Sequence, residues 1–352
     1  MKQRLLPIVC VIAALTIVPT VKGYQLGPLE KELQVWIQQA HPVDASAIQS
    51  DYDPTKVSVE KIRTLELTVN DKKRQRDIPL LVYLPKQTKA AEVIVHSHGL
   101  GGSRETSSFL GQHWAARGYV AVFTQHPGSD IFIWQDVAPV KRRRALKKAA
   151  NTENFKLRVA DVPTVIDQLE QWNRQTDHPL HSRMNLKQIG MSGHSFGATT
   201  TQHVGGQASS GKAAYQDKRI KACIPMSPSV TRIGNANRAF GKITLPWLCM
   251  TGSHDKSVIG SFPVENRLAV YDSLPPKDKY ELVLFEAEHS AFTEPRKNAK
   301  QAKRNPNHHR AIKATSTAFW DAYLRGDPQA KKWLTTDSVR SALATKDRWQ
   351  HK

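Results

Sequence analysis

A five-residue stretch with a glycine at each end constrains the fold of this 352-residue chain more than any other feature. Gly193-His194-Ser195-Phe196-Gly197 follows an apolar run at 187–191 and precedes small residues at 198–201. This order predicts a strand, a sharp turn and a helix, with the serine projecting from the turn. Glycine is expected at both ends, because a Cβ atom there would collide with the neighbouring strand and helix backbones.

The rest of the chain alternates predicted strands with predicted helices. Continuous apolar strands between helices are typical of a mostly parallel sheet covered on both faces. Segment 64–69 alternates with period two and ends in a polar turn, so it predicts an antiparallel hairpin with 78–84. Pro163 predicts a kink, or a start near Asp161, in the helix expected at 155–172. The other expected strands are 93–95, 119–123, 222–226, 247–251 and 281–285, and the other helices are 109–117, 265–274 and 306–325. The fold class predicted is a single α/β domain over residues 60–327.

The first 23 residues resemble a targeting segment. Lys2 and Arg4 are basic, residues 5–19 are almost wholly apolar, and Val21-Lys22-Gly23 offers a small-residue cleavage site before Tyr24. This pattern predicts a signal peptide cleaved near Gly23-Tyr24, and export to the periplasm or the outside of the cell. The alternative is an uncleaved N-terminal anchor.

Two segments flank the predicted domain. Residues 24–59 form an N-terminal extension with one amphipathic helix candidate at 28–39. Residues 328–352 form a basic C-terminal tail that we expect to be helical.

The chain is strongly basic, with 51 Lys and Arg against 31 Asp and Glu and a net charge of +20. Such a balance attracts anionic surfaces, whether lipid, polysaccharide or acidic substrate. No nucleic-acid recognition module is visible, so a nucleic-acid partner is not expected. The simplest alternative is a basic surface that is only solvated.

Cys223 and Cys249 lie inside apolar, strand-like runs. They predict two buried free thiols that behave as small apolar side chains. Export would also permit a disulfide between them.

A serine hydroxyl needs an adjacent base that is itself oriented by an acid. After a turn of this kind the expected chain order is Ser, Asp or Glu, then His. Asp255 follows the strand expected at 247–251, and His289 follows the strand expected at 281–285, so both stand at carboxyl ends of strands. Ser195, Asp255 and His289 are therefore the predicted catalytic residues, a turn aspartate and a loop histidine being the alternatives.

Acyl transfer also needs two N–H groups directed at the developing oxyanion. One should belong to Phe196, directly after the serine. The other should belong to Leu100, in the loop His98-Gly99-Leu100-Gly101-Gly102 after a buried strand. We expect His98 to brace this loop, whose spacing does not fit a phosphate-binding motif.

These motifs resemble those of the dienelactone-hydrolase-like α/β hydrolases, and within them bacterial relatives of platelet-activating-factor acetylhydrolases. The resemblance covers roughly residues 60–327 and is carried by the segments 98–104, 193–197 and 285–290. It implies a catalytic triad at Ser195, Asp255 and His289, with oxyanion donors at Leu100 and Phe196. Dienelactone hydrolases use a cysteine nucleophile, so the serine here argues against dienelactone activity.

A segment between residues 125 and 151 leaves the carboxyl end of a strand and should border the site. Phe132 and Trp134 are candidates to line an acyl pocket, and the basic run 141–148 to attract anionic material. Core packing and a solvated helix face are the alternatives.

The sequence thus predicts an exported serine hydrolase that cleaves small-molecule or lipid carboxylic esters through an acyl-enzyme, with no metal and no organic cofactor. A phospholipase or lipase, or a polyester hydrolase, are alternatives with the same triad. A non-catalytic binding protein with this fold is a more distant one. Fold and triad do not specify the ester.

Overall fold

The computed structural model describes residues 52–230, 235–257, 259, 263–295 and 305–352. All described residues belong to one compact unit, Tyr52–Lys352. The predicted signal peptide and the helix candidate at 28–39 lie outside the described residues.

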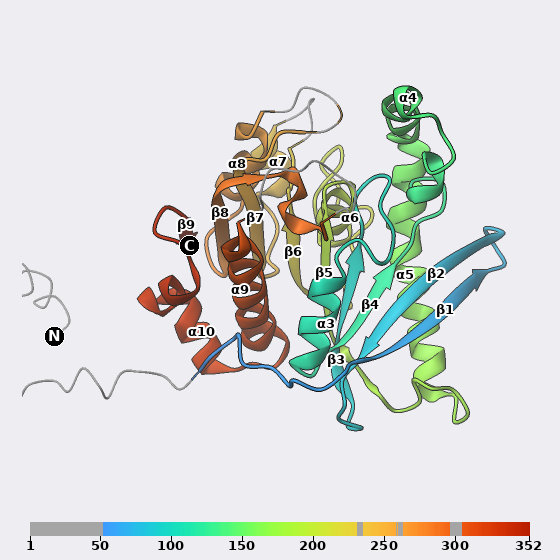
Figure 1. Ribbon diagram of the computed structural model, residues 1–352, viewed down its shortest axis with the longest axis horizontal. Helices are drawn as coiled ribbons and strands as arrows, with labels where there is room; N and C mark the ends of the chain where they lie inside the picture. The colour runs from blue at the N-terminus through green and yellow to red at the C-terminus, as the bar shows by residue number, and fades with distance from the viewer. Residues whose placement is uncertain (1–51, 231–234, 258, 260–262, 296–304) are drawn as a thin grey trace, which may run out of the picture. The chain divides into compact units, whose positions relative to one another are not determined.

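In the described part of the chain, nine strands form one sheet in the order β1-β2-β4-β3-β5-β6-β7-β8-β9 (Figure 1). The strands are β1 (Arg63–Asp71), β2 (Arg76–Leu84), β3 (Ala91–Ser97), β4 (Val120–Thr124), β5 (Met184–His194), β6 (Ile220–Met226), β7 (Trp247–His254), β8 (Lys279–Glu288) and β9 (Arg348–His351). From β4 to β8 all neighbours are parallel. β1 and β2 form the predicted antiparallel hairpin. The carboxyl ends of the parallel strands therefore meet along one edge of the sheet.

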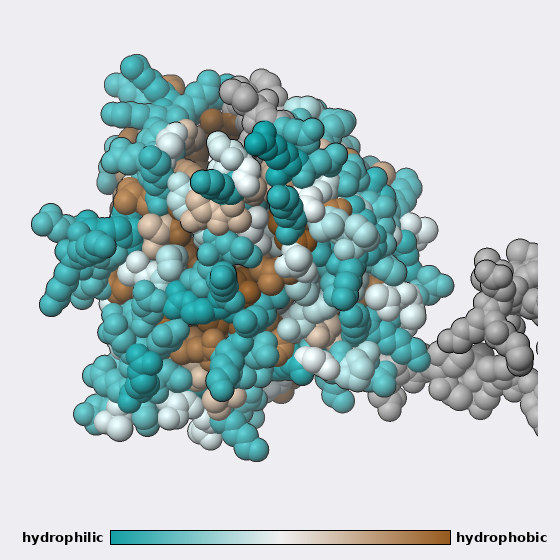
Figure 2. Space-filling view, turned by 180° about the vertical axis from the view of Figure 1, so that it is seen from behind, coloured by the Kyte–Doolittle hydropathy of each residue, from teal (hydrophilic) through white to brown (hydrophobic). Residues whose placement is uncertain are grey.

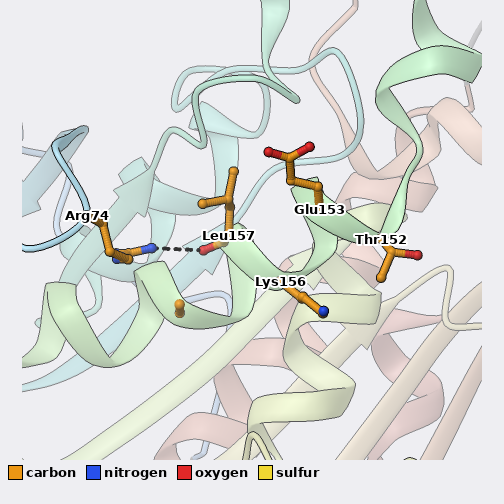
Figure 3. Close-up of a pocket in the computed structure, with 6 residues that line it drawn as sticks. Arg74, Thr152, Glu153, Lys156 and Leu157 are labelled. Carbon is orange, nitrogen blue, oxygen red and sulfur yellow. Dashed lines mark hydrogen bonds between the residues drawn. The ribbon is translucent and has the colours of Figure 1, made fainter.

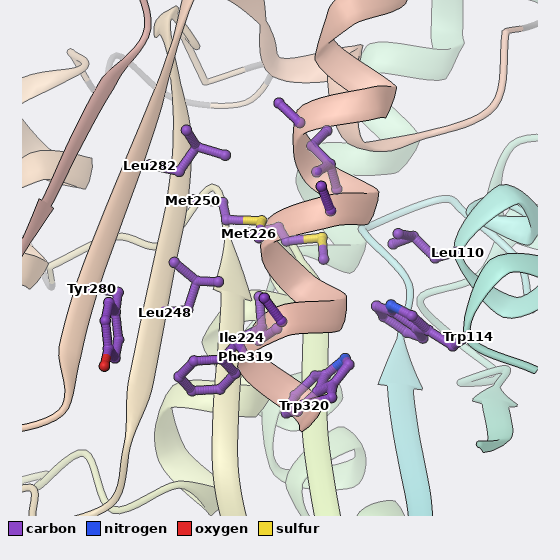
Figure 4. Packing of buried hydrophobic residues seen from close by; sticks show 14 of the residues in the cluster. Leu110, Trp114, Ile224, Met226, Leu248, Met250, Tyr280, Leu282, Phe319 and Trp320 are labelled. Atoms are coloured by element: carbon purple, nitrogen blue, oxygen red, sulfur yellow. The ribbon is translucent and has the colours of Figure 1, made fainter. Parts of the chain in front are cut away.

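Helices cover both faces of this sheet. They are α3 (Ser108–Ala116), α4 (Pro139–Ala149), α5 (Thr152–Arg174), α6 (Phe196–Val204), α7 (Ala236–Phe240), α8 (Glu265–Asp272), α9 (Pro306–Leu324) and α10 (Pro328–Thr335), with 3-10 turns η2 (Ile131–Ile133), η3 (His289–Phe292) and η4 (Asp337–Ala342). The apolar residues of α3, α9 and α10 pack on one face, and those of α5, α7 and α8 on the other. Figure 4 shows the first layer, where Trp114 of α3 and Trp320 of α9 meet near the strands. The predicted α/β fold is confirmed.

Helix α5 differs from the sequence prediction. It runs without a break from Thr152 through Pro163, so a start near Asp161 is wrong. Asn151 caps the helix, because its side-chain oxygen accepts the N–H of Asn154 at 2.8 Å. Burial of apolar residues on both sides of the proline compensates for the hydrogen bond that proline cannot donate. These residues are Val159, Val162, Val165, Ile166 and Leu169.

The C-terminal segment is helical only in its first part. After α10 and η4 the chain turns back as β9, which pairs antiparallel with β8. Trp349 in β9 is buried, and its indole N–H donates to the carbonyl oxygen of Leu334 at 3.0 Å. The expectation of a helical tail is therefore wrong for Arg348–His351, which form a strand that covers an otherwise open sheet edge.

Cys223 in β6 and Cys249 in β7 are buried and free, as predicted. Burial raises the pKa of both thiols. Among the described residues, no helix has the length and apolar character needed to cross a bilayer.

Candidate active site

The predicted turn lies between the end of β5 and the start of α6. Ser195 occupies it with φ 58° and ψ −112°, a backbone conformation that is strained for a residue with a side chain. A Cβ atom on Gly193 would overlap the carbonyl oxygen of Gly197, and one on Gly197 would overlap the carbonyl oxygen of Ser97. The turn is thus so tight that only glycine fits on either side of the serine.

Ser195, His289 and Asp255 form one hydrogen-bonded chain. His289 Nε2 lies 2.9 Å from Ser195 Oγ, and His289 Nδ1 lies 2.7 Å from Asp255 Oδ1. The three residues directly follow β5, β8 and β7, whose carboxyl ends share one edge of the sheet. The structure therefore brings together all three residues that the sequence singled out, although they are 34 to 94 positions apart.

Three residues that the sequence analysis missed hold Asp255 in place. The Ser227 and Thr251 hydroxyls donate to Asp255 Oδ2 at 2.6 and 2.9 Å, and Arg267 Nε lies 3.0 Å from Oδ1. Burial opposes ionisation of Asp255, but the hydrogen bond and charge of His289, the charge of Arg267 and the Ser227 hydroxyl outweigh it and lower the pKa to about 2. Asp255 is therefore an anion at neutral pH.

Arg267 is the least expected of these three residues. It lies within α8 and is 3% exposed. Its guanidinium also donates to the backbone carbonyl oxygens of Asp255 and Ser227, both at 2.7 Å. A single arginine within a predicted helix carries no motif, so no sequence signal marked it.

The two predicted oxyanion donors are available. Within the described part of the chain, neither the Leu100 N–H nor the Phe196 N–H has a hydrogen-bond partner. The loop that carries Leu100 lies against the serine, because a Cβ atom on Gly99 would be 3.4 Å from Ser195 Cβ. Backbone N–H groups without internal partners beside a serine are suited to bind a negatively charged oxygen.

Neighbouring hydrogen bonds fix the shape of this loop. The Gly101 N–H donates to the carbonyl oxygen of Ser129 at 2.9 Å. His98 Nε2 accepts the backbone N–H of His126 at 3.0 Å, so Nδ1 carries the ring proton and donates to the carbonyl oxygen of Gly99 at 2.6 Å. Burial and the nearby Arg158 charge hold the pKa of His98 well below its usual value. His98 is thus a neutral brace for the loop, as expected.

Arg158 of α5 joins this loop to the helix that follows the serine. Its side chain is fully buried and donates to the His98 carbonyl oxygen, to Ser129 Oγ at 2.9 Å and to Thr200 Oγ1 at 3.3 Å. Its guanidinium carbon lies 4.7 Å from the centre of the Phe196 ring. No carboxylate of the described residues lies within 4.0 Å of it. The sequence analysis did not identify this residue.

Asp161, the buried carboxylate that acts most strongly on Arg158, is already paired with other cations. Asp161 accepts hydrogen bonds from Arg74, Arg76 and His126 at 2.8 to 2.9 Å. Burial lowers the pKa of Arg158 to about 9, and attraction to Asp161 and Asp130 offsets only part of that effect. Arg158 therefore remains a cation at neutral pH, and its direct acceptors are all neutral.

The two candidate pocket residues, Trp134 and Phe132, have different surroundings. The indole N–H of Trp134 donates to the carbonyl oxygen of Gly101 at 2.7 Å, so this side chain borders the loop. Phe132, in η2, is 65% exposed. A role for either residue in acyl binding stays a prediction.

A surface hollow of about 440 Å³ lies along α5 and contains none of the predicted site residues. Figure 3 shows the side chains that line it, Arg74, Thr152, Glu153, Lys156 and Leu157. In the described part of the chain, no three or more His, Cys, Asp or Glu side chains are grouped to hold a metal ion.

Comparison with protein families agrees with the resemblance in the motifs. Residues 145–307 match the model of a family described as PETase, PET hydrolase-like, which belongs to the dienelactone hydrolase-like clan of α/β hydrolases. The matched stretch contains Ser195, Asp255 and His289 and points to an α/β hydrolase that acts on esters. No curated protein matches the chain. The likeness to the dienelactone-hydrolase-like group is confirmed, and the closer likeness to platelet-activating-factor acetylhydrolases stays a prediction.

Proposed function

We propose that this chain is a serine carboxylic-ester hydrolase that works through an acyl-enzyme on Ser195. The observation that carries the proposal is the hydrogen-bonded chain from Ser195 through His289 to Asp255, built on a strained turn. Strain at a buried turn persists only where the surroundings enforce it, and such positions cluster at active sites.

In the proposed reaction, Ser195 Oγ attacks the ester carbonyl carbon while His289 Nε2 takes the hydroxyl proton. The N–H groups of Leu100 and Phe196 donate to the resulting oxyanion. His289 then returns the proton to the leaving alkoxide, which departs as the alcohol and leaves the acyl group on Ser195. Water, deprotonated by His289, hydrolyses this acyl-enzyme and releases the acid.

Asp255 orients His289 and stabilises its protonated form. Its carboxylate accepts the Nδ1 proton, which leaves Nε2 free to act as a base toward the serine. Because the pKa of Asp255 is lowered to about 2, the carboxylate stays ionised across the neutral range.

The substrate class is proposed from the family match and the site together. The match to a PET hydrolase-like family favours a polyester among the alternatives, and a phospholipid or other lipid ester remains the second candidate. A hydrolase-fold protein that only binds its ligand would not need the serine, base and acid to be aligned.

Hydrolysis of p-nitrophenyl acetate by the purified protein tests the chemistry. Ser195→Ala should lower kcat by about 10⁶-fold with little change in folding, and Asp255→Asn should lower it by about 10⁴-fold. The exposed Ser341→Ala is the matched control and should leave kcat unchanged. An active Ser195→Ala variant would contradict the assignment.

A series of p-nitrophenyl esters of increasing acyl length, a polyester film and phosphatidylcholine then separates the substrate candidates. Release of acid from the film but not from the phospholipid would support a polyester, and the reverse result a lipid.

Export is part of the proposal. The N-terminal segment predicts cleavage near Gly23-Tyr24. N-terminal sequencing of the exported fraction should find Tyr24 first, and a chain retained in membranes with Met1 intact would favour the anchor instead.

A further inference from the structure

The helix α4 has one inward and one outward side. Arg142, Ala145, Leu146 and Ala149 lie on the inward side and are buried or half-buried. The outward residues from 141 to 148 are all exposed and all basic. They are Lys141, Arg143, Arg144, Lys147 and Lys148.

These five outward cations have no counter-charge. None of them has a carboxylate within 4.0 Å among the described residues. The nearest acids along the chain are Asp136 and Glu153, on either side of the helix. The charges of the five outward cations therefore add to one positive field, which attracts an anionic partner.

Large apolar side chains are exposed beside these cations. Val140, at the start of α4, is 89% exposed, and Phe132 in the adjacent η2 is 65% exposed. Exposed apolar side chains do not stabilise a helix whose outer side contacts only water. Cations attract anionic lipid headgroups, and exposed apolar side chains beside them can enter the boundary between headgroups and acyl chains.

This surface adjoins the candidate active site. A Cβ atom on Gly101 would lie 2.6 Å from Leu146 of α4 and 2.6 Å from Trp134. The guanidinium carbon of Arg142 lies 5.1 Å from the Trp134 ring centre. In Figure 1, α4 stands at the end of the molecule toward which the parallel strands point, and Figure 2 shows hydrophilic side chains standing out along the same edge from behind.

We propose that the α4 surface, made of Phe132, Val140 and the five outward cations, docks the protein on an anionic lipid bilayer with the Ser195 site beside that bilayer. The lipid is favoured over a dissolved polyanion because, of these two anionic partners, the lipid surface is the one that offers an apolar phase for Phe132 and Val140. That the docked protein then cleaves esters held in the bilayer rests on the proposed function with its second substrate candidate, the lipid ester, whereas docking itself does not require catalysis.

Sedimentation of the full-length protein with vesicles tests the docking. The vesicles contain equal parts phosphatidylcholine and phosphatidylglycerol, or phosphatidylcholine alone. Reversing Arg143, Arg144, Lys147 and Lys148 to Glu should weaken binding to the anionic vesicles by about 100-fold, since each cation near such a surface contributes several-fold. The reversed protein should still hydrolyse p-nitrophenyl acetate at the wild-type rate.

A matched control reverses four exposed lysines at the opposite edge of the sheet, three that precede parallel strands and Lys187, which lies near the start of β5. They are Lys89, Lys187, Lys218 and Lys242. This variant has the same net charge and the same N-terminal segment, and should bind nearly as well as the wild type. Equal loss in both variants would overturn the proposal in favour of a general charge effect, and equal retention would exclude α4 as the docking element.

Heparin distinguishes the lipid from a dissolved polyanion. The double variant Phe132→Ser, Val140→Ser should bind anionic vesicles at least several-fold more weakly and bind heparin as well as the wild type. Equal vesicle binding by this variant and the wild type would contradict docking on a lipid bilayer and would favour a dissolved polyanion as the partner. Ser195→Ala should bind vesicles normally, so loss of hydrolysis and loss of docking are told apart.

Discussion

Two buried arginines flank Ser195, and they have different surroundings. Arg267, on the acid side, pairs with the Asp255 carboxylate at 3.0 Å. Arg158, on the oxyanion side, donates only to neutral oxygens, among them the His98 carbonyl and Ser129 Oγ. The Arg267 charge is therefore neutralised by a direct ion pair, whereas Arg158 has no carboxylate in direct contact.

We expect this difference to matter for the proposed catalysis. A positive charge that is already paired mainly holds its partner in position. A buried cation without a direct counter-charge also leaves a positive potential in a region of low dielectric, and Arg158 contacts the two segments that carry Leu100 and Phe196. We therefore expect Arg158 to matter more to the reaction and Arg267 more to the acid range of stability.

The largest effect is expected for Arg158→Met. It leaves three buried acceptors without their donor, so the free energy of unfolding should fall by about 3 kcal/mol or more. A displaced oxyanion loop should lower kcat by about 100-fold. Urea unfolding and ester hydrolysis measure the two effects.

Arg158→Lys separates charge from geometry. Lysine keeps the cation but cannot reproduce the planar fork that reaches several acceptors. If Arg158→Lys has a higher kcat than Arg158→Met, the part of kcat that lysine restores is due to the positive charge. If Arg158→Met kept the wild-type kcat, the larger catalytic role expected for Arg158 than for Arg267 would be wrong.

Arg267→Met should have a smaller effect on kcat, about 10-fold, because Asp255 keeps the Ser227 and Thr251 hydroxyls and His289. Steady-state kinetics on p-nitrophenyl acetate measure it. A loss in kcat larger than that of Arg158→Met would reverse the comparison.

The same substitution should shift acid stability. The pKa of Asp255 is lowered to about 2, so its ionisation contributes stability that is complete above about pH 4 and is lost as the pH falls through about 2. Without the Arg267 charge this pKa rises, so the contribution becomes smaller and its loss is complete at a higher pH, whereas the onset, set by the unfolded-state pKa of about 4, stays the same. The free energy of unfolding, measured from pH 5 down to pH 2, should diverge from that of the exposed control Arg238→Met; identical curves would contradict the role given to Arg267.

The smallest effects are expected for single hydroxyls. Ser129→Ala removes an acceptor of Arg158, and Thr251→Val removes one of two hydroxyl donors to Asp255 Oδ2. Each should lower the free energy of unfolding by about 1 kcal/mol. The Ser129 variant should lose more, because Ser227 still serves Asp255. Urea unfolding measures both variants. A larger fall in the free energy of unfolding for Thr251→Val than for Ser129→Ala would argue against this difference between the surroundings of Asp255 and Arg158.

The sequence predicted the parts of the site that depend on local geometry or on strand ends. Gly193 and Gly197 reveal the turn because no other residue fits, and Asp255 and His289 stand where parallel strands end. Arg158 acts on a residue 60 positions away through packing of α5, which no spacing encodes.

The fold was predicted for similar reasons. Apolar strands with helices between them specify the parallel sheet, whereas β9 depends on a distant pairing with β8. Pro163 does not end α5, since burial of apolar residues on both sides of it stabilises the helix.

Covalent labelling with a fluorophosphonate tests the central claim most directly, because only an activated serine attacks phosphorus readily. Intact-protein mass spectrometry of the wild type should show one adduct, mapped by peptide analysis to Ser195. Ser195→Ala should show none, and Ser341→Ala should label like the wild type. No adduct on the wild type, or an adduct that persists in Ser195→Ala, would contradict the account.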